Sequence, residues 1–259
     1  MKRIRTFSAL AALGCAALPA PSFAAQCAKE SPPHAVALLE LYTSEGCNSC
    51  PQADQWLGRL GRGAPIADSV VPLALHVDYW DRLGWKDRFA DVRFSIRQGA
   101  LAGLGGSGVV YTPGVFLSLR ELRGWNSPAS FQQSLKKINA RNAGADIRIE
   151  LEPISASQLA VKAQFKVKPG AKRPQAFVAL YENGLSTEVK AGENRGVTLR
   201  HDYVVREWIG PLDPAAPFTR TMALGRGWKA KDLGVAAFVQ DISSGEVLQA
   251  TALAACFNG

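Results

Sequence analysis

Two cysteines separated by two residues lie in the segment TSEGCNSCP, residues 43 to 51. At this spacing Cys47 and Cys50 can form a redox couple, half of a metal site or a structural disulfide. A structural zinc site needs about four ligands, commonly two such pairs, and this chain has one pair and three histidines. The C-x-x-C-H motif of c-type haem attachment is excluded because Pro51 follows the pair. We therefore favour thiol–disulfide exchange, with copper or zinc handling and a non-catalytic structural bridge as open alternatives.

The residues around the pair predict a strand, a turn and a helix. The apolar run AVALLELYT, residues 35–43, is typical of a buried strand and ends in a Ser-Glu-Gly turn. Apolar positions then recur at helical spacing up to residue 60, so Cys47 is predicted at a helix N-terminus. Unpaired N–H groups and the helix dipole lower the pKa of a cysteine there from about 8.5 to about 3.5–7.5. We expect Cys47 to be the attacking thiol and Cys50 the resolving thiol.

Three further residues are candidates for the same site. Thr112 and Pro113 precede a predicted strand and follow a glycine-rich stretch, a typical place for a cis proline. Because proline has no N–H, the backbone of Thr112 could pair with an extended peptide; an ordinary trans proline is the alternative. Glu40, on the strand before the pair, is interpreted either as a buried carboxylate that accepts a proton from Cys50 or as a solvated glutamate.

The elements that must position these residues alternate up to residue 144. Strand-like runs at residues 35–43, 70–77 and 111–119 are separated by helical patterns. A last helix is predicted with Ser127 as its N-cap and its end at Gly144. Alternation of this kind predicts an α/β unit around a mostly parallel sheet.

Beyond this point the pattern changes to period two with one polar face, as in DIRIELE and QLAVKAQFKV. About seven short strands in the remaining segment point to a β-sandwich. The predicted fold class is therefore an α/β N-terminal domain, residues 25–144, followed by an all-β, sandwich-like C-terminal domain, residues 145–259.

The first 24 residues are interpreted as a cleavable signal peptide. They combine a basic start, a run of twelve apolar residues and a small-residue cleavage site. The apolar run is too short to span a bilayer, so a periplasmic or secreted location is expected. Removal of Lys2, Arg3 and Arg5 lowers the formal net charge from +8 to +5. The scattered charge does not indicate nucleic-acid binding, and no later stretch is apolar enough for a membrane span.

Two cysteines of the mature chain remain, Cys27 and Cys256. An exported chain meets an oxidising compartment in which disulfides persist. We expect these two residues to form a structural disulfide between the mature N-terminus and the last strand, the alternative being that either one stays free.

The order of strand, C-x-x-C and Thr-Pro resembles the thioredoxin superfamily. The motifs LELYTSEGCNSCPQAD, HVDYWDRLGWKDRF, VYTPGVF and ENRGVTLRHDYVVR are more specific and are similar to the exported bacterial family catalogued as domain of unknown function 1223. The superfamily implies Cys47 as attacking thiol, Cys50 as resolving thiol and Pro113 as a cis proline beside them. Gly46 replaces the tryptophan that usually precedes the pair.

The resulting hypothesis is a periplasmic thiol–disulfide oxidoreductase that acts through a mixed disulfide. Its expected partners are protein or small-molecule disulfides and thiols, and no cofactor is expected. Enzymatic activity itself is left open by the sequence, since the family carries no assigned substrate.

Overall fold

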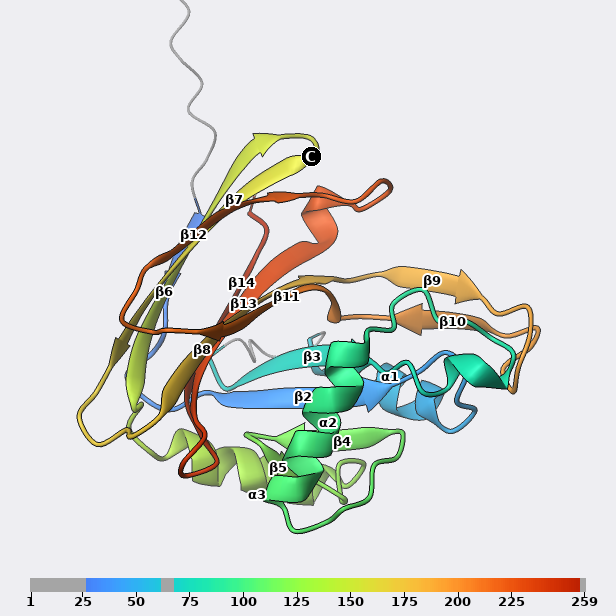
Figure 1. Ribbon diagram of the computed structural model, residues 1–259, viewed down its shortest axis with the longest axis horizontal. Coiled ribbons are helices and arrows are strands. Elements are labelled where there is room, and N and C mark those ends of the chain that lie inside the picture. The colour runs from blue at the N-terminus through green and yellow to red at the C-terminus, as the bar shows by residue number, and fades with distance from the viewer. Residues whose placement is uncertain (1–26, 62–67, 257–259) are drawn as a thin grey trace, which may run out of the picture.

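The computed structural model describes residues 27–61 and 68–256 (Figure 1). The strands of the first half are β1 Cys27–Glu30, β2 Ala37–Thr43, β3 Val70–His76, β4 Gly114–Leu117 and β5 Arg120–Glu121. Those of the second half are β6 Ala145–Ser155, β7 Gln158–Val167, β8 Pro174–Glu182, β9 Leu185–Glu188, β10 Thr198–His201, β11 Val204–Leu212, β12 Phe218–Ala223, β13 Leu233–Asp241 and β14 Glu246–Ala254. The α-helices are α1 Cys50–Leu60, α2 Val92–Leu104 and α3 Pro128–Asn139, and short 3-10 helices cover Asp81–Leu83 and Ala230–Asp232.

One eight-stranded mixed sheet organises the described part of the chain, in the order β14-β13-β8-β11-β3-β2-β4-β5. Strands β2 and β3 are parallel, and β3 pairs in parallel with β11 through Ala74 and Val204. The other neighbouring pairs in this sheet are antiparallel. A second, antiparallel sheet has the order β1-β6-β7-β12, and β9 and β10 form a separate two-stranded hairpin.

The predicted fold class, an α/β thioredoxin-like N-terminal domain followed by an all-β sandwich-like domain, is wrong. Fourteen strands and three α-helices make the described residues mostly β. The sheet of the first half does not end at β3. On the side away from β2, β3 pairs with β11, and the sheet continues into β8, β13 and β14. The predicted boundary between residues 144 and 145 falls between α3 and β6 and stays a prediction.

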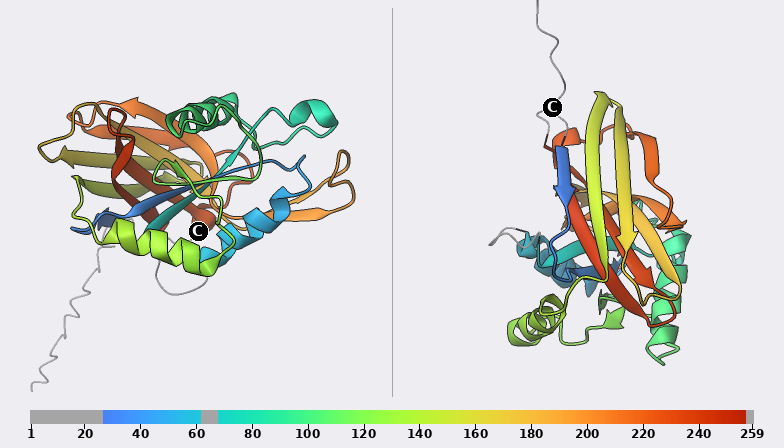
Figure 2. Two further views of the ribbon diagram at one scale, coloured as in Figure 1. Left: turned by 90° about the horizontal axis from the view of Figure 1, so that it is seen from below. Right: turned by 90° about the vertical axis from the view of Figure 1, so that its left-hand side faces the viewer.

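Helices cover one part of the large sheet, and the four-stranded sheet covers another part. Helices α1 and α3 pack on the face that carries Leu39 and Leu41, and α2 packs on the face of Leu38 and Tyr42 (Figure 2). Successive side chains of a strand point to opposite faces, which explains this division. The four-stranded sheet covers the part of the large sheet formed by β8 and β13, with Ile149 in their shared core. The cysteine pair lies where β2 passes into α1.

The ends of the helices follow local sequence signals. The predicted N-cap Ser127 is confirmed: its hydroxyl accepts a hydrogen bond from the backbone N–H of Ser130, and Pro128 is the first helical residue. Helix α3 ends at Asn139, five residues before the predicted end at Gly144. In α2 the carboxylate of Asp91 caps the helix by accepting a hydrogen bond from the N–H of Arg93 at 2.8 Å. No helix within residues 27–61 and 68–256 is long and apolar enough to cross a membrane.

Candidate functional site

Cys47 and Cys50 are joined by a disulfide, with their Cα atoms 5.4 Å apart. After β2, the backbone N–H of Cys47 donates to the carbonyl oxygen of Ser44 at 3.2 Å, and that of Cys50 donates to the carbonyl oxygen of Cys47 at 3.3 Å. These turns carry the chain into α1, whose N-cap is Ser49. Cys47 therefore lies in the turn before the helix, and Cys50, not Cys47, is the first helical residue.

The disulfide is closed off from solvent. Cys47 and Cys50 both have an exposed fraction of 0%, whereas Asn48 and Ser49 between them are exposed. A working couple is expected to present Cys47 at the surface. The structure instead exposes the backbone turn and buries both sulfur atoms.

The Thr112–Pro113 peptide bond is cis, and its loop is tied to the cysteine turn through Trp80. The indole Nε1–H of Trp80 donates to Oγ1 of Thr112 at 2.7 Å. The Cβ atom of the same tryptophan lies 3.2 Å from the place a Cβ would take on Gly46. Any side chain at position 46 would crowd this contact, which accounts for the glycine directly before Cys47.

Replacement of Trp80 by phenylalanine is expected to lower the free energy of unfolding by about 1 kcal/mol, the net contribution of one hydrogen bond. A double-mutant cycle with Thr112→Val, followed by urea unfolding, measures this contact. The double variant should lose little more than either single variant. Fully additive losses would show that the two side chains do not interact.

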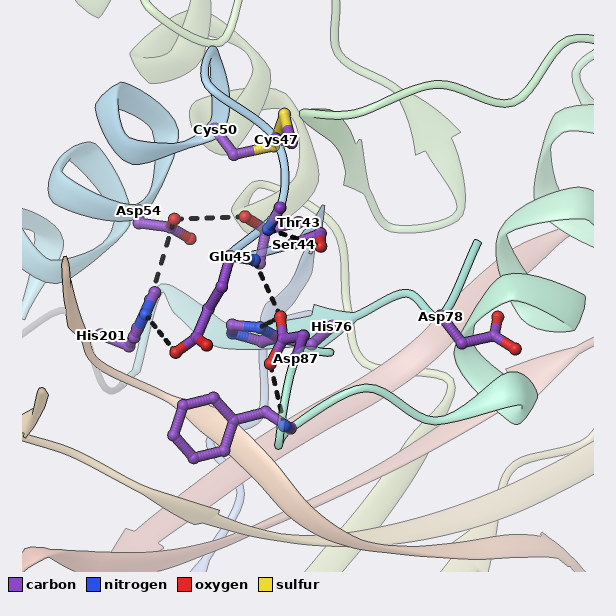
Figure 3. Close-up of polar contacts among 12 residues, drawn as sticks. Thr43, Ser44, Glu45, Cys47, Cys50, Asp54, His76, Asp78, Asp87 and His201 are labelled. Carbon is purple, nitrogen blue, oxygen red and sulfur yellow. Dashed lines mark hydrogen bonds and ion pairs between the residues drawn. A yellow bond between two sulfur atoms is a disulfide. The ribbon is translucent and has the colours of Figure 1, made fainter. Parts of the chain in front are cut away.

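Beneath the disulfide lies a group of five buried titratable side chains, here called the acid–histidine cluster (Figure 3). Its members are Glu45, Asp54, His76, Asp87 and His201. The His76 Nδ1 and Asp87 Oδ2 atoms are 2.7 Å apart, and the two histidine rings meet edge to face with centroids 5.0 Å apart. His201 Nε2 lies 3.4 Å from Glu45 Oε1, and His201 Nδ1 lies 3.8 Å from Asp54 Oδ2.

Burial and mutual charge set the protonation states of this cluster. Burial by itself would raise the pKa of Asp87, but the charge and hydrogen bond of His76 outweigh it and hold that pKa at about 2. Burial lowers the pKa of His76, yet the facing Asp87 carboxylate raises it overall. Burial raises the pKa of Glu45, but its polar contacts with His201, Thr187 and Trp85 together lower it overall, and the pKa of Asp54 is raised by burial. Asp87 and His76 thus form an ion pair, and Asp54 is the carboxyl that most favours its neutral form.

Glu40 is buried, but on the other face of the sheet from the couple. Its carboxylate accepts hydrogen bonds from Arg97 of α2 at 2.5 and 3.2 Å and from the hydroxyl of Tyr42 at 3.3 Å. Arg97 lies over the rings of Phe177, Trp208 and Phe238. Because α1 covers the opposite face, the structure does not bring Glu40 together with Cys50. The carboxyl on the side of α1 is Asp54, one helical turn after Cys50.

Sequence reasoning missed Asp54, Asp87, His201 and Asn194 as parts of this site. A signal was present for Asp54, because positions 50 and 54 share one face of the predicted helix. The other three lie in motifs that the sequence singles out, Asp87 in HVDYWDRLGWKDRF and Asn194 and His201 in ENRGVTLRHDYVVR. These motifs do not show that the two distant segments meet at the cysteine turn. His76, at the end of β3, is fully buried in the core. Among the described residues, no group of three or more histidine, cysteine or acidic side chains could hold a metal ion.

Comparison with known proteins places the chain in a family. Residues 38–240 match the family described as "Protein of unknown function (DUF1223)", and the chain belongs to this family. A crystal structure of an Agrobacterium tumefaciens protein is 23% identical, covers 87% of this chain and 97% of that chain, and has a TM-score of 0.61. A search of curated protein sequences found no match.

Two proteins of Porphyromonas gingivalis are also similar in structure. HBP35 is 16% identical, with a TM-score of 0.61 over 86% of this chain and 76% of that chain. A domain of the outer membrane lipoprotein Omp28 is 18% identical over 43% of this chain and 88% of that chain, with a TM-score of 0.28, which is too low to support an argument. The first of these similarities, like that to the Agrobacterium protein, concerns the fold alone.

Proposed function

We propose that the protein is a thiol–disulfide oxidoreductase of the periplasm or the extracellular space, and that Cys47 and Cys50 are its redox couple. The observation that carries the proposal is the disulfide at a spacing of two residues where a strand passes into a helix. The location rests on the predicted leader and on the two disulfides, which persist in oxidising compartments.

A stabilising role alone explains this bridge poorly. By the chain-entropy relation, a disulfide stabilises a protein by restricting the unfolded chain, and its contribution grows with the loop that it closes. The Cys47–Cys50 bridge has a sequence separation of 3, against 229 for Cys27–Cys256. The relation gives about 2 kcal/mol for the short loop and about 5 kcal/mol for the long one. The short bridge therefore gives the smaller of the two contributions.

The proposed exchange is balanced in electrons and protons. Cys47 of the reduced couple, as thiolate, attacks one sulfur of the partner's disulfide, that S–S bond breaks, and the electron pair leaves on the partner's other sulfur, which takes up a proton. Cys50, as thiolate, then attacks Sγ of Cys47 in the mixed disulfide, re-forms the Cys47–Cys50 bridge and releases the partner's second sulfur as a thiol. Two electrons have passed to the partner, and a donor dithiol returns the couple to its reduced form by the reverse steps. Asp54, one helical turn from Cys50, is the buried carboxyl whose pKa is raised by burial.

Trapping of the mixed disulfide tests this proposal. Cys50→Ser removes the resolving thiol, so Cys47 in this variant should retain partners when the protein is expressed with its leader in a bacterial periplasm. Non-reducing electrophoresis and mass spectrometry identify the adducts, and the double variant Cys47→Ser/Cys50→Ser is the control. An absence of adducts, together with a native bridge that resists reduced glutathione, would contradict the proposal.

A second candidate function is a non-catalytic binding protein in which this bridge only shapes the turn. The complete burial of both cysteines favours it, because exchange requires access to a sulfur atom. The two candidate functions differ in whether the buried disulfide can become accessible to a partner thiol.

A further inference from the structure

A loop in the second half of the chain contacts the turn that carries the disulfide. Residues 189–197, here called the cap loop, connect β9 and β10 in the two-stranded hairpin. Figure 1 shows this hairpin extending past the ends of β2 and β3, next to the start of α1. Val189 is buried and exchanges backbone hydrogen bonds with Gly196 and Val197 at 2.8 and 3.0 Å, which fix the base of the loop.

Asn194 joins the cap loop to the cysteine turn. Its side-chain amide donates to the carbonyl oxygens of Glu45 and Cys47, each at 2.9 Å. Asn194 is 5% exposed, whereas its neighbours Glu193 and Arg195 are exposed. One buried amide thus satisfies two backbone carbonyls on either side of Gly46.

Glu193 adds a second attachment. Its carboxylate accepts a hydrogen bond from the backbone N–H of Asn48 at 3.1 Å. The cap loop therefore contacts the turn before Cys47 and the turn after it. These three hydrogen bonds hold the backbone around the couple and do not involve the sulfur atoms. Breaking them would therefore leave the chemistry of both cysteines unchanged.

We propose that Asn194 is a latch that keeps the Cys47–Cys50 disulfide closed, and that a partner gains access only by displacing the cap loop. An attacking thiolate must approach Sγ of Cys47 in line with the S–S bond, and neither sulfur-bearing residue is exposed in the latched state. A two-stranded hairpin outside the main sheets opens at a lower cost than the core strands do. The latch rests on the proposed function, because it regulates access to the same couple. Its effect on the rate at which the disulfide is reduced can nevertheless be measured with any thiol.

The rate of reduction by dithiothreitol tests the latch in the full mature protein. Samples are quenched with an alkylating reagent, and mass spectrometry counts the reduced cysteines of each bridge separately. Asn194→Ala should speed reduction of the Cys47–Cys50 bridge at least tenfold relative to the native protein. The Cys27–Cys256 bridge is the internal reference: its rate should not change, since it lies in another part of the fold.

Two further variants control the measurement. Arg195→Ala changes an exposed side chain of the same loop and should leave both rates at their native values. Glu193→Ala removes only the contact with Asn48 and should give a smaller acceleration, of about threefold. This variant keeps the test decisive if Asn194→Ala fails to fold, because Glu193 is exposed.

The outcomes separate the latch from the proposed function. Native reduction rates in both Asn194→Ala and Glu193→Ala, or an equal acceleration of both bridges, would overturn the latch. Selective acceleration combined with a failure of Cys50→Ser to trap partners would leave the latch standing and refute the oxidoreductase proposal. Trapped partners without any acceleration would support the oxidoreductase proposal and overturn the latch.

Discussion

Replacement of Asp87 by asparagine is expected to lower the free energy of unfolding by about 3–5 kcal/mol, the usual cost of removing one member of a buried ion pair. Asp87 is 2% exposed. Its carboxylate accepts hydrogen bonds from the backbone N–H groups of Glu45 at 2.8 Å and Phe89 at 2.9 Å, and it faces Nδ1 of His76 at 2.7 Å. An amide in this place removes the charge that His76 requires and turns a donor toward other donors. Urea unfolding at neutral pH measures the loss.

Asp146→Asn is the matched control, because Asp146 forms an ion pair with Lys168 at the surface, where the two side chains are 50% and 41% exposed. Such pairs contribute about 0–1 kcal/mol. A loss of comparable size in the two variants would contradict the role assigned to the buried pair.

Asp87→Asn is also expected to change how the free energy of unfolding depends on pH. The pKa of Asp87 falls from its ordinary 3.8 to about 2 in the folded protein, so its contribution is present above about pH 4 and is lost as the pH falls toward 2. The pKa of His76 is raised by the facing carboxylate, so its contribution is present below pH 6.5 and is lost as the pH rises through the raised value. The stability difference between native protein and Asp87→Asn should therefore shrink by about 2 kcal/mol between pH 4 and pH 2. A constant difference would contradict the lowered pKa.

The error in the predicted fold can be traced to particular strands. Strands β6 and β7 alternate between buried and more exposed residues, as the period-two pattern predicts. Strand β13, in contrast, is buried at every position, and β8 is buried from Ala176 onward. The runs AFVALY and GVAAFV are continuous apolar stretches, which is typical of strands covered on both faces. This signal was available, but the pairing of β3 with β11 rests on one parallel contact between distant segments that no local pattern reveals.

The site was predictable only where it is local. The cysteine pair, its strand and its helix are contiguous in the sequence, and the pattern predicts them together. The same reasoning brings Glu40 near the pair, yet alternation along β2 turns it away from α1, and the sequence does not say which face the helix covers. Asp87, Asn194 and His201 reach the cysteine turn across long sequence separations. The contacts of Asn194 and His201 depend on how the hairpin of β9 and β10 lies against α1, and those of Asp87 depend on how the segment after β3 lies against the turn after β2.

Replacement of both Cys27 and Cys256 by alanine is expected to lower the free energy of unfolding by about 5 kcal/mol, as an upper value before strain is subtracted. The structure pairs these residues, with their Cα atoms 6.0 Å apart. Cys27 begins β1, which pairs with β6 through Leu151, and Cys256 follows β14. The bridge thus joins the edge of the four-stranded sheet to the end of the large sheet. Without it the unfolded chain regains the freedom of a loop with a sequence separation of 229.

The double variant Cys47→Ala/Cys50→Ala is the control with the same chemistry and a short loop, for which the chain-entropy relation gives about 2 kcal/mol. Denaturant unfolding of both double variants and the native protein compares the two bridges directly. Removal of the long bridge should lower the free energy of unfolding by about 3 kcal/mol more than removal of the short one, because in the chain-entropy relation the contribution of a bridge grows with the length of its loop. Equal losses, or a larger loss at Cys47 and Cys50, would mean that the short bridge holds the turn against the cap loop and the acid–histidine cluster. The role of the short bridge would then be structural, which would contradict the small stabilising contribution on which the assignment as a redox couple rests.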